Sequence, residues 1–229
     1  QEVNYYFPEP NPLFYEDLPL SQSTRLDRLR IFTTLSRYLL PGTQKPDTPP
    51  VMVAPIRALM TRTVPRRTFL KNTLRIKVGD RQDFHQVSTH LVGIGYEYSN
   101  IVVSPGQFSR RGGILDVWSP SEDLPVRLDF FGDEIDSIRT FDPSSQRSEG
   151  KLEQALIFPA SEALPIAAMR DGELPYQLKE QDIPEIYQFP SSLVDFLPEN
   201  SLILLDGEEF IEAAANDIEE EALERLEEL

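Results

Sequence analysis

The sequence has no cysteine and only two histidines among its 229 residues. Without thiols the chain has no disulfide, no thiolate nucleophile and no cysteine zinc site, and we expect a cytoplasmic location. His85 and His90 lie five positions apart on an expected helix, so they project about 140° apart and are not expected to share a metal ion. No run approaches the ~18 apolar residues of a membrane helix, and no membrane contact is expected.

Motifs for nucleotide, cofactor or hydrolytic chemistry are also missing. The chain has no G-x-x-x-x-G-K-[ST], no G-x-G-x-x-G, no G-x-S-x-G and no H-E-x-x-H. Asp133, Glu134 and Asp136 are better explained by a hairpin turn than by a metal cluster. We therefore expect no catalytic residues, no cofactor and no metal. A hydrolase of an unrecognised type, with carboxylates clustered in a cleft, remains an alternative.

Charge is unevenly distributed along a chain of otherwise ordinary globular composition. The net charge is -16, yet residues 56–113 hold 10 Lys and Arg against 3 Asp and Glu, and residues 114–229 hold 7 against 29. Such a split predicts an anionic or acidic partner for the middle segment. Alternatively, the basic and acidic segments face each other in the fold or are solvated. The acidic majority argues against free nucleic acid as the partner.

Hydrophobic spacing predicts an α/β domain at both ends of the chain. Leucines and a phenylalanine recur at helical spacing over residues 24–39, and the short apolar run 51–55 is typical of a buried strand that pairs in parallel with a strand near the N-terminus. Residues 201–206 form another apolar run, which we expect to be a buried strand of the same sheet. An acidic helix is expected from residue 210 to residue 229.

The middle of the chain has a different texture. Short strands with turns at hairpin spacing follow one expected helix, which predicts an antiparallel sheet backed by that helix. The predicted fold is therefore α/β: a discontinuous α/β domain at 1–67 and 149–229, with a small α+β domain inserted at 68–148. The missing initiator Met and the end inside an apparent helix predict a fragment of a longer protein.

Residues 104–120 hold the strongest candidate for a binding surface. Arg110 and Arg111 adjoin Gly112-Gly113, and the only tryptophan, Trp118, lies just before a proline. Arginine presents a rigid fork of donors to carboxylates, and Trp and Arg are frequent hot spots of interfaces. Strand alternation places Arg110 and Trp118 on one face and Arg111 on the other, unless the glycine pair forms a bulge that shifts the register.

A purely structural role for the same residues is the alternative. Trp118 would then fill the core between sheet and helix, and the two arginines would pair with Asp129 or Asp133.

The string PGQFSRRGGILDVWSPSEDLPVRLDFFGDEIDSIRTFDPSSQRS resembles the second domain of the bacterial transcription-repair coupling factors, in their UvrB-homology region. UvrB shares the F-x-x-R-G and F-G-D-E-I patterns. The ending FDPSSQRS and the upstream string YYFPEPNPLFYEDLPLSQSTRLDRLRIFTTLSRYL are more similar to the coupling factors, and the aromatic DNA-wedging hairpin of UvrB is not evident. The resemblance implies a degenerate helicase-like α/β domain from which a preceding strand and helix are missing.

This resemblance implies a non-catalytic docking fragment. In both families the middle domain binds UvrA, the damage-recognition ATPase, so the fragment would recruit UvrA in nucleotide excision repair of transcription-blocking damage. Arg111 occupies the arginine of the family's R-G pair, and the further expected contacts are Arg110, Gly112, Phe108, Trp118 and Tyr98. Where the family has another arginine, next to Tyr96, this chain has Glu97 and Tyr98, so that contact is lost or is supplied by Arg75, Lys77 or Arg81.

The resemblance also implies parts outside this chain. The parent protein would be an ATP-dependent DNA translocase that contacts RNA polymerase and DNA through other domains, and a C-terminal domain would mask the docking face. A UvrB-like module that contacts DNA directly is the alternative function.

Overall fold

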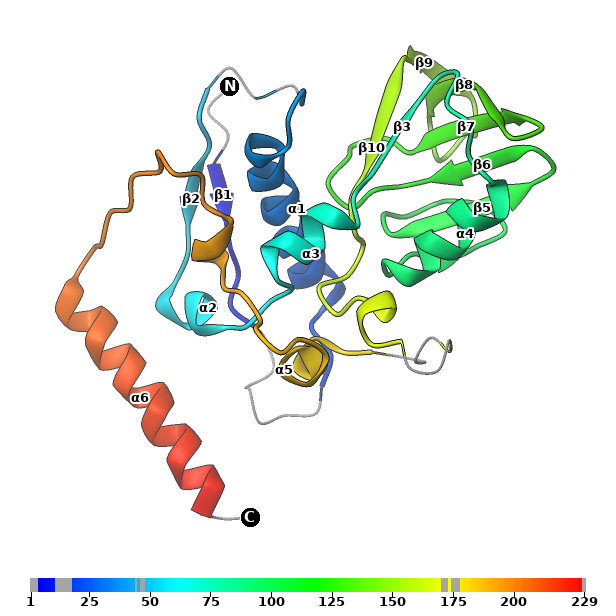
Figure 1. The fold of residues 1–229 in the computed structure, drawn as a ribbon. Coiled ribbons are helices and arrows are strands. Elements are labelled where there is room, and N and C mark those ends of the chain that lie inside the picture. The colour runs from blue at the N-terminus through cyan, green and yellow to red at the C-terminus, as the bar shows by residue number, and fades with distance from the viewer. Residues whose placement is uncertain are drawn as a thin grey trace. The chain divides into compact units, whose positions relative to one another are not determined.

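The computed structural model describes residues 4–10, 18–43, 45, 48–169, 173 and 178–227, and it divides the chain into two compact units (Figure 1). Unit 1 comprises residues 1–66 and 179–229, and unit 2 comprises residues 67–178. The boundary differs from the one expected at residue 148, because two strands beyond that position pair within unit 2. The protein is a mixed α/β structure with a six-stranded mixed sheet and several helices.

Unit 1 contains a two-stranded parallel sheet, helices and short 3-10 turns. Its elements are β1 (Asn4–Tyr6), α1 (Gln22–Leu39), β2 (Val51–Val53), α2 (Ile56–Met60), η2 (Glu180–Asp182), α5 (Ile183–Ile186), η3 (Leu193–Phe196) and α6 (Glu208–Glu227). Pairing of Tyr5 with Met52 confirms the expected parallel arrangement of the two strands. Ser21 caps α1 by accepting a hydrogen bond from the backbone N–H of Thr24, at 3.1 Å.

Contacts between distant segments hold unit 1 together. The rings of Phe32 in α1 and Phe196 in η3 have centroids 4.6 Å apart. Thr63 and Ser191 exchange two backbone hydrogen bonds of 2.8 and 3.0 Å. Arg25 and Glu180 form an ion pair at 2.8 Å. The two sequence segments of unit 1 therefore share one core.

Two apolar segments of unit 1 are more exposed than their composition predicts. Val51 and Val53 of β2 are each 58% exposed, although a buried strand was expected there. Residues 201–206 form no strand, and Leu202, Ile203, Leu204 and Leu205 are exposed. The prediction of a third buried strand is wrong for this structure, because a strand needs a neighbouring strand edge to satisfy its backbone, and residues 201–206 pair with none of the described strands.

Unit 2 is built around the six-stranded sheet, whose strand order follows the chain from β4 to β9. Its elements are α3 (Arg66–Lys71), β3 (Leu74–Lys77), α4 (Phe84–Gly93), β4 (Glu97–Tyr98), β5 (Gln107–Arg111), β6 (Ile114–Val117), β7 (Val126–Phe131), β8 (Glu134–Phe141), β9 (Ser148–Leu152), β10 (Gln154–Ile157) and η1 (Pro165–Ala167). All neighbours pair antiparallel except β4 and β5, which are parallel. The expected antiparallel sheet is therefore confirmed with one parallel edge, and β3 pairs separately with β10.

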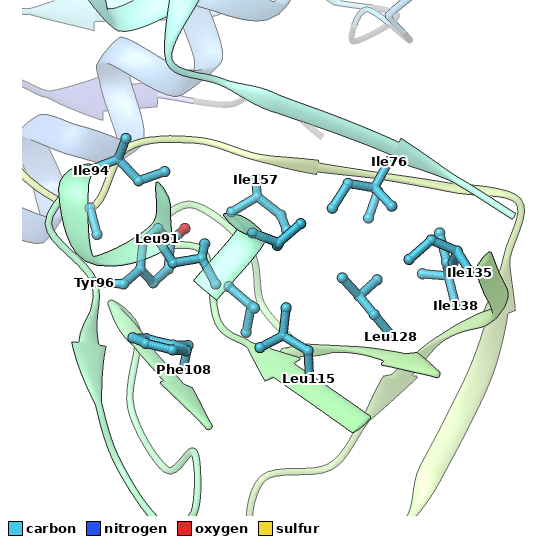
Figure 2. Close-up of a cluster of buried hydrophobic side chains, with 14 residues drawn as sticks. Ile76, Leu91, Ile94, Tyr96, Phe108, Leu115, Leu128, Ile135, Ile138 and Ile157 are labelled. Atoms are coloured by element: carbon cyan, nitrogen blue, oxygen red, sulfur yellow. The ribbon is translucent and has the colours of Figure 1, made fainter. Parts of the chain in front are cut away.

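The core of unit 2 lies on one face of this sheet, which we call the inner face. Figure 2 shows Ile76 and Ile157 of the β3–β10 pair facing Leu115 and Leu128 of the sheet, with Leu91 of α4 beside them. All five side chains are at most 1% exposed. Removal of these apolar side chains from water is the main stabilising contribution to unit 2, because each Å² of buried apolar surface contributes ~25 cal/mol. The opposite, outer face carries the polar residues of the same strands.

Candidate functional site

The β5–β6 hairpin ends in a two-residue glycine turn that is fastened to the next strand. Arg111 pairs with Ile114 across Gly112-Gly113, and Gly112 has a φ of +59°, which favours glycine. The backbone N–H of Phe130 in β7 donates to the carbonyl of Gly113 at 2.7 Å. A Cβ on Gly113 would lie 2.8 Å from the carbonyl oxygen of Phe130, so only glycine fits this approach. The arginines beside the turn are therefore held on a well-defined backbone.

Arg110 and Arg111 are both exposed, and neither forms an ion pair with any residue in the described part of the chain. Asp129, one of the acids considered as a partner, instead accepts hydrogen bonds from Ser137 at 2.6 Å and from Arg139 at 2.5 Å. Exposed guanidinium groups keep their donors available to carboxylates of another molecule. The part of the structural alternative in which Asp129 or Asp133 pairs with these two arginines is contradicted for the described residues.

The strand register places the two arginines on opposite faces. Arg110 pairs with Leu115 and belongs to the inner face, although its side chain is exposed. Arg111 pairs with Ile114, which pairs with Asp129, and these three residues belong to the outer face. The expected bulge at the glycine pair is not there, and the register shift in this part of the sheet lies at Asp129/Phe130 instead. One partner surface therefore has to reach around the hairpin end to contact both arginines.

Phe108, expected as a partner contact, is instead a core residue that is 3% exposed. It pairs with Val117 on the inner face. Tyr98 of the edge strand β4 is 58% exposed, and its ring meets that of Phe108 edge-on at 5.6 Å. Trp118 is partly buried, and its Nε1–H donates to the carbonyl of Glu122 at 2.8 Å. Of these three aromatic residues, Tyr98 offers the most surface to a partner.

A basic contact was expected to be lost or replaced next to Tyr96. Tyr96 itself belongs to the core, whereas Glu97, which follows it, is exposed. Tyr96 is buried and its hydroxyl donates to the carbonyl of Phe158 at 2.8 Å. Burial raises the pKa of Tyr96 above its ordinary value. Arg81 is one of the residues considered as a replacement for the missing family arginine. It lies 3.9 Å from Glu134 in an exposed ion pair.

A buried ion pair stabilises the outer face. Asp116 accepts two hydrogen bonds from the guanidinium of Arg127, at 2.7 and 2.8 Å. Hydrogen bonding by Asp116 raises the pKa of Arg127, against the opposing effect of burial. The guanidinium also lies 4.5 Å from the ring centroid of Phe141. Arg127 thus has its charge satisfied internally, unlike Arg111.

Phe131 is a surface residue that sequence reasoning missed. It is 83% exposed, the largest fraction among the large apolar residues that the structure describes in unit 2. The signal was present in the sequence: Val126, Leu128 and Phe130 alternate toward the inner face, so Phe131 has to point to the outer face.

Within the described residues, no three His, Asp or Glu side chains gather in a group that could hold a metal ion. No helix in the described part of the chain combines the length and the apolar character needed to span a bilayer.

The net charge of the folded units differs from that of the sequence segments. Unit 2 holds 12 Lys and Arg against 16 Asp and Glu, a net charge of -4, because the basic stretch 56–113 is divided between the units and is joined in unit 2 by later acidic residues. The basic character is thus confined to local surfaces such as the end of the β5–β6 hairpin.

Comparison with known proteins gives a family-model match within unit 2 and matches of larger parts of the chain to full-length proteins. Residues 74–162 match the family model of the UvrB interaction domain. The transcription-repair-coupling factor of Myxococcus xanthus is 44% identical over 115 residues, or 50% of this chain and 10% of that protein. The Bacillus subtilis factor is 31% identical over 195 residues (69% and 17%), and that of Escherichia coli is 37% identical over 125 residues (55% and 10%).

The chain spans between 10% and 17% of the length of these relatives. The resemblance noted on residues 105–148 is confirmed, since that string lies within the matched domain. The chain therefore corresponds in sequence to the N-terminal region of the transcription-repair-coupling factors (Mfd) and contains a UvrB interaction domain.

Proposed function

We propose that this chain is a non-catalytic docking module that recruits UvrA to transcription-blocking DNA damage in the cytoplasm. The observation that carries the proposal is the exposed Arg111, which lies beside a fastened glycine turn in the UvrB interaction domain and has no ion-pair partner among the described residues. A guanidinium in this position is free to form charge-assisted hydrogen bonds with carboxylates of a partner. Arg110, Gly112 and Tyr98 are proposed as its neighbours in the docking surface.

The wider protein is part of the same proposal. Unit 1 would be a degenerate helicase-like domain that has no catalytic role in this chain. Translocation on DNA driven by ATP and contact with RNA polymerase would belong to other domains of the parent protein, and a C-terminal domain would mask the docking surface until UvrA is needed. Masking is consistent with a surface whose charged groups are unpaired within unit 2.

Titration of the chain with purified UvrA tests the proposal. Replacing Arg111 by alanine should weaken binding about 30-fold or more, because truncating one partner of a desolvated charge pair costs ~2 to 5 kcal/mol. Arg147→Ala is the matched control: it makes the same charge change at an exposed arginine between β8 and β9. Equal binding by the parent and Arg111→Ala, or equal losses in the two variants, would remove Arg111 from the interface.

The alternative of a module that contacts DNA directly makes a different prediction. Binding to duplex DNA would fall steeply with salt, because counterions released from the phosphates drive such binding. The net charge of -4 on unit 2 opposes it. Measurable retention of the chain on duplex DNA at 150 mM salt, without UvrA, would favour this alternative.

A further inference from the structure

We infer that two copies of this chain pair through strand β9 (Ser148–Leu152) in an antiparallel, two-fold symmetric dimer centred on Gly150. The inference goes beyond docking to UvrA and does not depend on it. β9 is the last strand of the six-stranded sheet, and β8 is the only strand that pairs with it in the described part of the chain (Figure 1). A strand at the edge of a sheet presents a row of backbone donors and acceptors to which another strand can be added.

The free edge of β9 is open to a partner along its length. The first four residues of the strand are exposed, and Leu152 is half-buried. The strand is already fixed on its other side by its ladder with β8, where the backbone N–H of Gly150 also donates to Oγ1 of Thr140 at 3.1 Å. A strand that is ordered before its partner arrives loses little conformational entropy on pairing, which favours association.

The charges of β9 identify a second copy as the occupant. Glu149 and Lys151 have opposite signs and lie one residue before and one residue after Gly150. Antiparallel pairing about Gly150 places Glu149 opposite Lys151 of the second copy, and the two-fold axis repeats this contact. Neither side chain forms an ion pair with any described residue of its own chain. Opposite charges that face each other across two strands stabilise the pairing.

Charge also selects this register over its neighbours. A shift by two residues in one direction places Glu149 opposite Glu149 of the second copy, and a shift in the other direction places Lys151 opposite Lys151. Like charges directly opposite each other destabilise a pair of strands. A second copy always supplies the complementary order of charges, whereas a strand of an unrelated protein matches it only by chance.

Two properties of β9 oppose pairing and set its strength. Charged residues and bulges commonly protect sheet edges from self-association. β9 has such a bulge, since Glu149 is the extra residue between Gly150, which pairs with Thr140, and Ser148, which pairs with Phe141. Protection by charge requires that pairing brings like charges together, and the register centred on Gly150 does not. The bulge and the short strand keep the contact small, so we expect a transient dimer with a dissociation constant of about 0.1 mM.

Sedimentation velocity of the full chain over a concentration series tests the inference, at about 150 mM salt so that repulsion between distant charges is screened. The parent should pass from monomer to dimer around the expected dissociation constant. Glu149→Lys and Lys151→Glu should each weaken self-association about tenfold or more, because each places like charges opposite each other. An equimolar mixture of these two variants should dimerise like the parent, because one copy then supplies two basic side chains and the other two acidic ones.

Two controls separate strand pairing from net charge and from folding. The double variant Glu149→Lys/Lys151→Glu keeps the net charge of the parent and restores the opposite pairs, so it should dimerise like the parent. Asp123→Lys makes the same charge change as Glu149→Lys at an exposed residue between β6 and β7, and it should leave dimerisation unchanged. Urea unfolding followed by the fluorescence of Trp118 should show that every variant is folded.

Three outcomes would overturn the inference. The first is a parent chain that stays monomeric well above the expected dissociation constant, because β9 is then a protected edge. The second is a dimer that both single variants leave unchanged, because the copies then associate through another surface. The third is a mixture of the single variants that fails to dimerise, because the register about Gly150 is then wrong. None of these measurements involves UvrA, so failure of the proposed function would leave the inference standing.

Discussion

Replacing Asp116 by asparagine should strongly destabilise unit 2. The side chains of Asp116 and Arg127 are 6% and 11% exposed, and two hydrogen bonds of 2.7 and 2.8 Å join them. Asparagine keeps the shape but removes the charge and replaces one acceptor oxygen by an NH2 donor, so the guanidinium stays buried without a contacting carboxylate. Its remaining neighbours are the amide oxygen at position 116, the carbonyl of Gln146 at 3.3 Å and the face of Phe141. Breaking a buried pair in this way costs ~3 to 5 kcal/mol, a large part of the ~5 to 15 kcal/mol that stabilises a domain.

Urea unfolding followed by tryptophan fluorescence measures this effect in the intact chain. Trp118 is the only tryptophan and lies in unit 2, so its signal reports that unit. With a slope of about 1.5 kcal/mol per M urea, a loss of ~4 kcal/mol lowers the midpoint by roughly 2.5 M. Glu134→Gln is the control, because its ion pair with Arg81 is exposed and should be worth at most ~1 kcal/mol.

A loss of less than ~1 kcal/mol in Asp116→Asn would refute the reasoning, since the pair would then behave like an exposed one. Replacing both members of the pair with apolar residues of similar volume should recover most of the stability, because no unpaired charge then remains buried. A double variant as unstable as Asp116→Asn would show that packing, and not the uncompensated charge, causes the loss.

Three further predictions follow from the hairpins and loops of unit 2. Gly113→Ala should lower the free energy of unfolding by ~1 to 3 kcal/mol in the same urea assay, because its Cβ would lie 2.8 Å from the carbonyl oxygen of Phe130; a stability equal to that of the parent would contradict the close approach. The pKa of Asp142 lies below its ordinary value of 3.8, because the backbone N–H and the hydroxyl of Ser145 bond to the carboxylate. A lowered folded pKa gives stability that is present above pH 4 and is lost as the pH falls through the folded pKa, so Asp142→Asn should unfold with a shallower pH dependence below pH 4. Raising the salt concentration should weaken UvrA binding more for the parent than for Arg111→Ala, and equal salt slopes in a titration series would argue against an arginine contact.

Much of unit 2 could be predicted from local sequence. Short β-rich runs separated by Pro-Gly, Ser-Pro-Ser and Gly-Asp turns indicated most of the hairpins, because turn chemistry and a two-residue period act over a few positions. The Gly112-Gly113 pair was expected to be a bulge within one strand, and it is a hairpin turn between β5 and β6. The parallel pairing of β1 with β2 followed from the strand, helix, strand order. The match of Arg111 to the arginine of the family's R-G pair was also readable, since a resemblance carried by a contiguous string needs no tertiary information.

The tertiary structure decided which of these residues reach the surface. Phe108 and Arg110 both belong to the inner face, yet Phe108 is buried while Arg110 is exposed, because the core covers only part of that face. No local pattern carries this difference, which depends on residues distant in sequence such as Ile76 and Ile157.

The same distinction explains the failed prediction at residues 201–206. Its apolar composition is correct for a buried strand, but burial requires a neighbouring strand edge and a covering layer, and both are properties of the assembled fold. For this protein the sequence alone determined the local turns, the strands of unit 2 and the relatives it resembles. Only the packing of distant segments decided where the units divide and which carboxylate pairs with Arg127. The same packing left Phe131 exposed on the face that also carries Arg111. These outcomes depend on long-range strand register and on which surfaces are covered, and no short stretch of sequence encodes either.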